Sequence, residues 1–482
     1  MQKYYGLKAK QFDIGLFSAL LVGMLFIAVV IAKLALTGAV LILGLCVALP
    51  IVLLTLRFPV VGMVLYLVGA NLIMWVYRMG VSFPLGTLMD AFEGIFILGL
   101  LLSFKQSPQW EKFKNPISTA IFVWIAYILI EAFNPTAESR LAWLYTVRSV
   151  ALIMLMFFVF LYQIKDLAQI QILIKTWMAF SLFAALYALK QEFIGFADFE
   201  EKYIHADPNL EMLLFQAGQW RKFSIFSDPV SFSYNMVITS LLCLGLLTGP
   251  LPAKKKIWLA LVGLICLWAM LYSGTRSAFA LVPAGGLMML LLKLNRQMIL
   301  LGIVGALLFI GLVFAPTSNP IINRFQSAFR PSEDASFNLR KMNQKKIQPY
   351  IQSHPLGGGL GATGIWGQRF SPHSYLANFP PDSGYVRVAV ELGWVGLILF
   401  STLILTILWT GIKNYFSIKD PLLRSYCLAM VLVIFALHIG NYPQEALVQF
   451  PSSVYFYLVA AIIVLLKRLY DEGMIQSSAL KR

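Results

Sequence analysis

The sequence predicts an all-α, polytopic helical membrane protein with about 12–14 transmembrane helices and a large, partly helical extracytoplasmic loop. Of its 482 residues, 59% are hydrophobic and only 12% are charged, whereas a soluble domain carries about 25% charged residues. Apolar stretches of about 17–25 residues, each long enough to cross the hydrocarbon core as a helix, recur along the chain. We therefore expect residues 1–482 to form a single membrane domain.

Successive apolar stretches define the predicted spans. The first follows a basic head with Lys3, Lys8 and Lys10, but it is longer than a signal-peptide core and lacks a small-residue cleavage site. We therefore expect it to be retained as a helix. The spans are predicted at 14–32, 34–56, 58–76, 87–104, 116–132, 143–162, 169–193, 229–250, 257–273, 277–292, 298–316, 388–411, 423–440 and 451–466.

Lysine and arginine residues concentrate in every second connection between these spans, as at Arg57, Lys165 and Lys254. Because this bias marks the cytoplasmic side, both termini are expected in the cytoplasm. Segments 194–228 and 317–387 then form two long extracytoplasmic loops, and loops of such length are usually functional. Within the larger loop, a polar stretch at 336–353 predicts a helix that ends before Pro355 and the glycines after it.

Arginine residues on the extracytoplasmic side are not explained by this bias. Arg221, Arg276 and Arg340 fall in the outside loops and Arg148 falls inside a predicted span, where a charge costs about 2.5–3.5 kcal/mol on insertion scales. A guanidinium binds phosphate oxygens bidentately and stays protonated, so converging arginines predict a clamp for a diphosphate lipid. The alternatives are an ion pair between Arg148 and an intramembrane acid such as Asp90, and an Arg276 side chain that reaches the headgroups.

Two residues of the larger loop are candidates for acid–base and acceptor contacts. A neutral imidazole at His373 can take a proton from a sugar hydroxyl, and the alternative is an ordinary loop histidine. Asp382 either orients an acceptor or starts the next helix as its N-cap. The residues leave both alternatives open.

No metal, cofactor or nucleic acid is predicted as a partner. The closest two histidines, His354 and His373, are 19 residues apart, whereas a metal centre needs several locally spaced ligands. The glycines at 357–361 lack the lysine and preceding strand of a nucleotide-phosphate loop. The four cysteines lie in apolar stretches and are expected to pack in the core. The net charge of +16 is dispersed between the spans and forms no basic stripe.

Several short motifs resemble those of the bacterial O-antigen ligase and O-antigen polymerase superfamily, over roughly residues 140–410. Members of that superfamily share a basic extracytoplasmic cavity and act on sugar chains carried by undecaprenyl diphosphate. The matching stretches are RKFSIFSDP at 221–229, SGTRS at 273–277, NLR at 338–340, HPLGGGLG at 354–361, and His373 followed by DSGY at 382–385 and ELGWVG at 391–396.

The resemblance implies a glycosyltransferase of the bacterial inner membrane, with its active site facing the periplasm. Arg221 and Arg276 are similar to the family's diphosphate-binding arginines, with Arg148 and Arg340 as further substrate contacts, and His373 to the histidine that activates the acceptor hydroxyl. The resemblance implies a metal-independent, inverting transfer to lipid A–core (a ligase) or to another lipid-linked repeat (a polymerase). Because His373 is followed here by serine and a longer insertion, Asp382 or Tyr385 is expected to share its work. A polysaccharide or lipid-linked sugar transporter is the rival class, since embedded arginines could also bind an anionic cargo.

Overall fold

The computed structural model describes Met24, Gly44, Cys46 and residues 48–81, 83–216, 218–318, 320–329 and 335–479. The chain divides into two compact units, Met1–Gly62 and Met63–Arg482. Within the first unit, Ala48–Arg57 is an apolar helix. Almost all of the predicted span 14–32 and much of the span 34–56 lie outside the described residues.

Ten helices in the described part of the chain are long and apolar enough to cross a membrane. Two more apolar helices, α10 and α11, lie at predicted spans but are not among these ten. Helix α10 carries three lysines in its first turn, and α11 has only 17 residues. These helices coincide with the spans predicted from 58–76 to 451–466, so the all-α, polytopic fold is confirmed. They are α2 (Pro59–Arg78), α3 (Leu85–Gln106), α4 (Pro116–Ile130), α5 (Arg140–Gln163), α6 (Leu167–Phe193), α9 (Pro229–Leu247), α10 (Ala253–Leu271), α11 (Arg276–Leu292), α12 (Arg296–Phe314), α16 (Gly384–Ser417), α17 (Pro421–Gly440) and α18 (Ser452–Ala479).

Short polar residues fix where several of these helices begin. A side-chain oxygen before the first turn accepts a hydrogen bond from a free backbone N–H, and proline at the first helical position needs no such bond. Both signals occur together at Asn115–Pro116, Asp228–Pro229 and Asp420–Pro421, ahead of α4, α9 and α17.

Helices α9, α17 and α18 form the centre of the second unit and are buried on nearly all sides. Helix α9 packs against α10, α11 and α17, and α18 packs against α5, α16 and α17. Buried polar side chains join neighbouring helices: Asn235 Nδ2 on α9 donates to Ser452 Oγ on α18 at 3.2 Å, and Trp177 Nε1 on α6 donates to Thr239 Oγ1 on α9 at 3.0 Å. Such interhelical hydrogen bonds satisfy groups that lipid could not.

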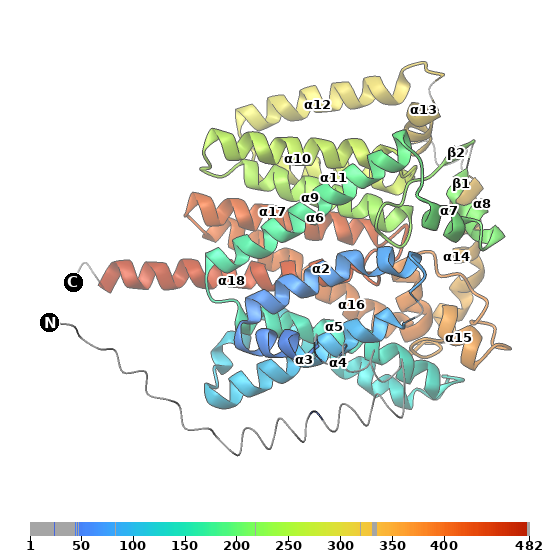
Figure 1. Ribbon diagram of the computed structural model, residues 1–482, viewed down its shortest axis with the longest axis horizontal. Helices are drawn as coiled ribbons and strands as arrows, with labels where there is room; N and C mark the ends of the chain where they lie inside the picture. Colours follow the sequence, from blue (N-terminus) through green and yellow to red (C-terminus); the bar gives the residue numbers. More distant parts are fainter. Residues whose placement is uncertain are drawn as a thin grey trace. The chain divides into compact units, whose positions relative to one another are not determined.

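The short elements of the second unit gather at one end of the long helices, apart from η1 (Trp110–Phe113), which joins α3 to α4 (Figure 1). All of them except η2 lie in the segments predicted as long loops, and α14 covers the stretch expected to be helical. The strands form an antiparallel hairpin in which Phe215 pairs with Trp220. These elements are η2 (Glu131–Phe133), α7 (Asp198–Ile204), α8 (Pro208–Leu214), β1 (Phe215–Gln216), β2 (Gln219–Trp220), α13 (Pro320–Ser327), α14 (Ala335–Ser353) and α15 (Gly364–Phe370).

The glycine-rich turn at 357–361, which follows α14, provides hydrogen-bond partners at a break in α16. Gly393 lies within α16 at φ 67° and ψ −176°, so the helical ladder is interrupted there. The turn supplies the missing partners: Gly358 N donates to the Val390 carbonyl at 2.9 Å, and Gly359 N donates to the Glu391 carbonyl at 2.8 Å. Buried backbone groups need such partners, so this turn is part of the helix packing.

Replacing Gly393 with alanine is expected to destabilise the protein by about 1–3 kcal/mol or more. A side chain is disfavoured at φ 67°, and its Cβ would lie 1.9 Å from the Pro355 carbonyl oxygen. The thermal-unfolding midpoint in detergent should fall, and proteolysis of the glycine-rich turn should accelerate. The matched control is Gly305→Ala in α12, where no atom approaches within 4 Å. A wild-type midpoint for Gly393→Ala would contradict this account of the break.

Candidate active site

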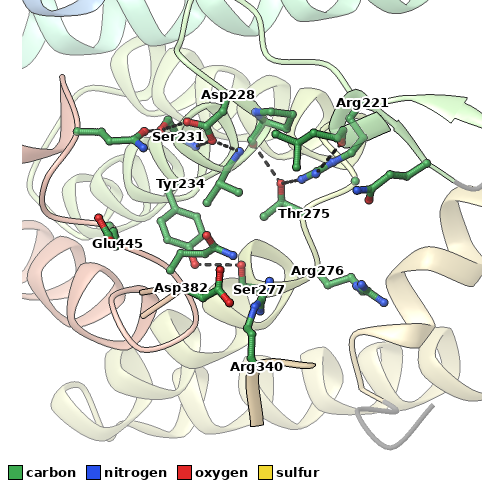
Figure 2. Close-up of a pocket in the computed structure, with 18 of the residues that line it drawn as sticks. Arg221, Asp228, Ser231, Tyr234, Thr275, Arg276, Ser277, Arg340, Asp382 and Glu445 are labelled. Atoms are coloured by element: carbon green, nitrogen blue, oxygen red, sulfur yellow. Dashed lines mark hydrogen bonds between the residues drawn. The ribbon is translucent and has the colours of Figure 1, made fainter. Parts of the chain in front are cut away.

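A cavity of about 450 Å³ lies at the end of the long helices where the short elements gather (Figure 2). Residues from α8, β1, α9, α11, α13, α14 and the start of α18 line it. Polar and charged side chains dominate its lining, unlike the apolar walls of most small-molecule sites. Its four arginines are Arg221, Arg276, Arg324 and Arg340, and its three acidic residues are Asp228, Asp382 and Glu445.

Arg221, which follows strand β2, is held rigidly in the cavity wall. Its Nε donates to the Ser273 carbonyl at 3.0 Å, Nη2 to Thr275 Oγ1 at 3.2 Å and Nη1 to the Leu213 carbonyl at 3.4 Å. Burial lowers the pKa of Arg221 to about 10, and the neighbouring arginines add to this effect. The guanidinium therefore stays protonated at neutral pH in a region of positive potential.

The break between α10 and α11 brings two arginines to the cavity. Gly274 adopts φ +59°, and a Cβ there would lie 2.8 Å from Arg324 Nε. Glycine therefore allows Arg324 Nε to donate to the Gly274 carbonyl at 2.8 Å. Arg276 is the first residue of α11, so its charge lies at the positive end of that helix dipole. The charges of Arg276 and Arg324 and the positive end of the α11 dipole all favour an anion in this part of the cavity.

Asp382 and Arg340 lie beside one another next to the hydrogen-bonded hydroxyls of Tyr234 and Ser277 (Figure 2). Burial raises the pKa of Asp382, and the charge of Arg340 opposes that rise. The N-cap of α16 is Ser383, whose side chain accepts from Val386 N. Of the two roles expected for Asp382, the capping role thus belongs to its neighbour, and the Asp382 carboxyl lines the cavity.

The remaining acidic residues of the cavity are engaged by protein donors. Asp228 caps α9 by accepting from Val230 N at 2.8 Å and Ser231 N at 2.9 Å. Glu445 lies on the opposite side of the cavity from Arg221 and Arg276 (Figure 2), and its Oε2 accepts from Arg387 Nη1 at 2.8 Å. Burial raises the pKa of Glu445 and the Arg387 charge lowers it. These bonds leave the side with Arg221 and Arg276 dominated by positive charge.

Three residues named from the sequence lie outside this lining. Arg148 forms an ion pair with Asp90, with 3.1 Å between Nε and Oδ2, which is one of the two arrangements expected for it. The Tyr385 hydroxyl lies 2.5 Å from His438 Nδ1. His373 is exposed on the segment between α15 and α16. The structure thus brings Arg221, Arg276, Arg340 and Asp382 to one cavity and places the other three elsewhere.

Sequence reasoning did not select Arg324 or Glu445 as site residues. Arg324 lies in the predicted extracytoplasmic loop 317–387, so the charge bias that indicated Arg276 applies to it as well. Glu445 lies in a short connection between two spans and carries no comparable signal. Its place in the cavity depends on how α17 and α18 pack.

Two comparisons relate this chain to known proteins, and the first covers part of the cavity lining. Residues 261–401, which include Arg276, Arg324, Arg340 and Asp382, match the family described as O-antigen ligase. The chain is also 27% identical over 288 residues to an O-antigen polymerase of Salmonella muenchen, a match that covers 57% of this chain and 68% of that protein. On both comparisons the chain is therefore similar to O-antigen ligases and O-antigen polymerases.

Proposed function

We propose that the protein transfers a glycan from undecaprenyl diphosphate to a hydroxyl of lipid A–core or a similar acceptor, acting as a ligase at the arginine cavity. The observation that carries the proposal is that four arginines from four separate segments line one cavity. Converging guanidiniums suit a diphosphate, whose oxygens accept paired N–H bonds. The alternative is a polymerase that uses a second lipid-linked repeat as acceptor, and the similarity to an O-antigen polymerase favours it.

The proposed reaction is a single displacement. The acceptor oxygen attacks the anomeric carbon, the bond between that carbon and the diphosphate breaks, and the lipid diphosphate leaves with the bonding electrons. Arg221, Arg276 and Arg340 would stabilise the charge that develops on the leaving diphosphate. Asp382 would accept the proton of the acceptor hydroxyl, because its carboxyl lines the same cavity. This route inverts the anomeric centre and needs no metal; His373 is the sequence-based alternative as base.

An extracytoplasmic position for the cavity, in the inner membrane, is supported by the distribution of lysines. Helix α10 ends at the cavity wall, so the lysines Lys254, Lys255 and Lys256 in its first turn lie at its far end. Helix α11 begins at the cavity, so Lys293 after its last residue also lies at the far end. Positive charge concentrates on the cytoplasmic side of membrane proteins.

The test is to combine the purified protein in detergent with a lipid-linked glycan and candidate acceptors, and to detect the new glycosidic bond by mass spectrometry. An enzyme forms the bond without a membrane, whereas a transporter does not. Deleting the gene separates the alternatives: loss of a ligase should leave long chains on the lipid diphosphate, and loss of a polymerase should leave acceptors capped by one repeat. Unchanged glycolipids on a gel would refute both.

A further inference from the structure

The turn from Arg221 to Asp228 contains a strained residue. Both ends of this turn line the arginine cavity, and residues 223–226 between them are buried. Ser224 adopts φ 53° and, in the part of the chain that the structure describes, is the one residue other than glycine with a positive φ. Side chains are disfavoured there, and such strain persists only where surrounding structure holds the residue in place. The contacts of Ser224 therefore identify what holds the turn.

Two long helices hold Ser224 through buried hydrogen bonds. On α6, Gln191 Oε1 accepts from Ser224 N at 2.9 Å, and the Ala184 carbonyl accepts from Ser224 Oγ at 2.6 Å. On α2, Arg78 Nη2 donates to the carbonyls of Ser224 at 2.9 Å and Phe226 at 2.8 Å. Backbone groups of a buried turn need such partners, and here they come from outside the turn.

Arg78 joins the turn to α2. It is the last residue of that helix, is 4% exposed and does not line the arginine cavity. Its Cζ lies 4.4 Å from the centroid of the Phe223 ring. Arginine near a helix end often bonds the last carbonyls of its own helix. Here only Nε does so, donating to the Met74 carbonyl at 3.3 Å. The enclosed guanidinium can therefore affect a bound substrate only through the turn.

The turn also determines where Arg221 lies. Arg221 is the third residue before Ser224, and its own N donates to the Leu214 carbonyl at 2.8 Å. Between them, Lys222 N donates to the Tyr272 carbonyl at 3.0 Å. The backbone that carries the Arg221 side chain is thus fixed on both sides. A group fixed before binding loses less conformational freedom when the ligand arrives, which raises affinity.

We propose that Arg78 is a positioning residue: by holding the carbonyls of Ser224 and Phe226, it fixes the turn that places Arg221 for the donor's diphosphate. The inference rests on the proposed diphosphate-binding role of Arg221. It extends the site to α2, a helix that contributes no residue to the cavity lining. An Arg78 with a purely structural role would stabilise the fold and leave the diphosphate affinity of the folded protein unchanged.

Hydrogen exchange of the full-length protein in detergent tests the support of the turn without any substrate. Arg78→Met removes the donors and keeps an unbranched side chain. Peptides covering 221–228 should then exchange about tenfold faster than in wild type, because two buried carbonyls lose their partner and the turn opens more often. Unchanged exchange would overturn the proposal, whatever the result of the transfer assay.

Ser224→Ala and Ser224→Gly form a second pair of variants that leaves Arg78 intact. Both lose the hydrogen bond to the Ala184 carbonyl, but only alanine keeps the cost of a side chain at φ 53°. Exchange of the turn should therefore be faster in Ser224→Ala than in Ser224→Gly. Equal exchange in the two variants would contradict a strained turn that its neighbours hold in place.

A double-mutant cycle tests whether Arg78 acts through Arg221. Binding of a short-chain isoprenyl diphosphate is measured for wild type, Arg78→Met, Arg221→Gln and the double variant. Arg78→Met should weaken binding about tenfold when Arg221 is present. It should weaken binding by no more than about twofold with Arg221→Gln, because the residue it positions is gone. Arg78→Lys should recover part of the affinity, since its ammonium can still donate to a carbonyl.

Arg468→Met is the matched control for the cycle. Arg468 Nη2 also donates to a backbone carbonyl, that of Leu161 at 3.0 Å, but it lies far along α18 from Ser452, which lines the cavity. Its loss should leave binding of the probe at the wild-type level. Wild-type binding by Arg78→Met, or equal weakening in both backgrounds, would overturn the positioning role. Normal binding by Arg221→Gln alone would instead reject the diphosphate role of Arg221, and with it the function on which the inference rests.

Discussion

Replacing Arg276 with alanine is expected to slow glycan transfer by about 10²–10³-fold, the usual effect of removing one preorganised group that stabilises charge in the transition state. The side chain lines the cavity at the start of α11, next to the wall that Arg221 forms. Its loss would remove positive charge where the proposed reaction releases the diphosphate. Initial rates with purified donor and acceptor measure the effect. Arg276→Lys should recover only part of the rate, because an ammonium lacks the planar fork of arginine.

Arg369→Ala is the matched control for this prediction. Arg369 lies on α15 near the same end of the helices, is exposed and does not line the arginine cavity. Its removal changes the net charge equally and should leave the rate within a few-fold of wild type. Arg221→Ala is less informative, because Arg221 also bonds the carbonyls of Ser273 and Leu213 and so supports the wall. Wild-type rates for Arg276→Ala would exclude Arg276 from catalysis.

Much of the fold could be predicted because lipid imposes a strict rule on each span. Every apolar stretch of sufficient length must satisfy its backbone internally as a helix, so the spans from 58–76 onwards coincide with observed helices. The helix α14 followed from a polar stretch that ends before proline and glycine. These signals lie within each segment. They suffice to predict the helices because lipid imposes the same requirement on every span.

The site depended on contacts that no local pattern contains. The charge bias marked arginines as unusual, yet it did not distinguish Arg276, which lines the cavity, from Arg148, which pairs with Asp90. His373 and Asp382 lie in one loop, and loop residues have no periodicity that indicates where a side chain points. Only the packing of α14 and α16 shows that the Asp382 carboxyl lines the cavity.

Asp382→Asn is expected to lower the transfer rate by about 10²–10⁴-fold, the contribution of a positioned general base. Burial raises the pKa of Asp382 above that of an ordinary aspartate. The carboxylate must be ionised to accept a proton, so wild-type kcat/KM should fall as the pH drops through this raised pKa. Asparagine cannot titrate, so the variant's residual rate should lack that limb. A pH profile of kcat/KM for both proteins measures the difference.

His373→Ala is the control that decides between the two bases. His373 is exposed and lies outside the cavity lining, so its loss should leave the acid limb and most of the rate intact. If the histidine variant instead loses the limb while Asp382→Asn retains it, the imidazole is the base and the loop must move to bring it to the acceptor. Because a carboxylate already in the cavity needs no such movement, Asp382 is the simpler assignment for the proton acceptor.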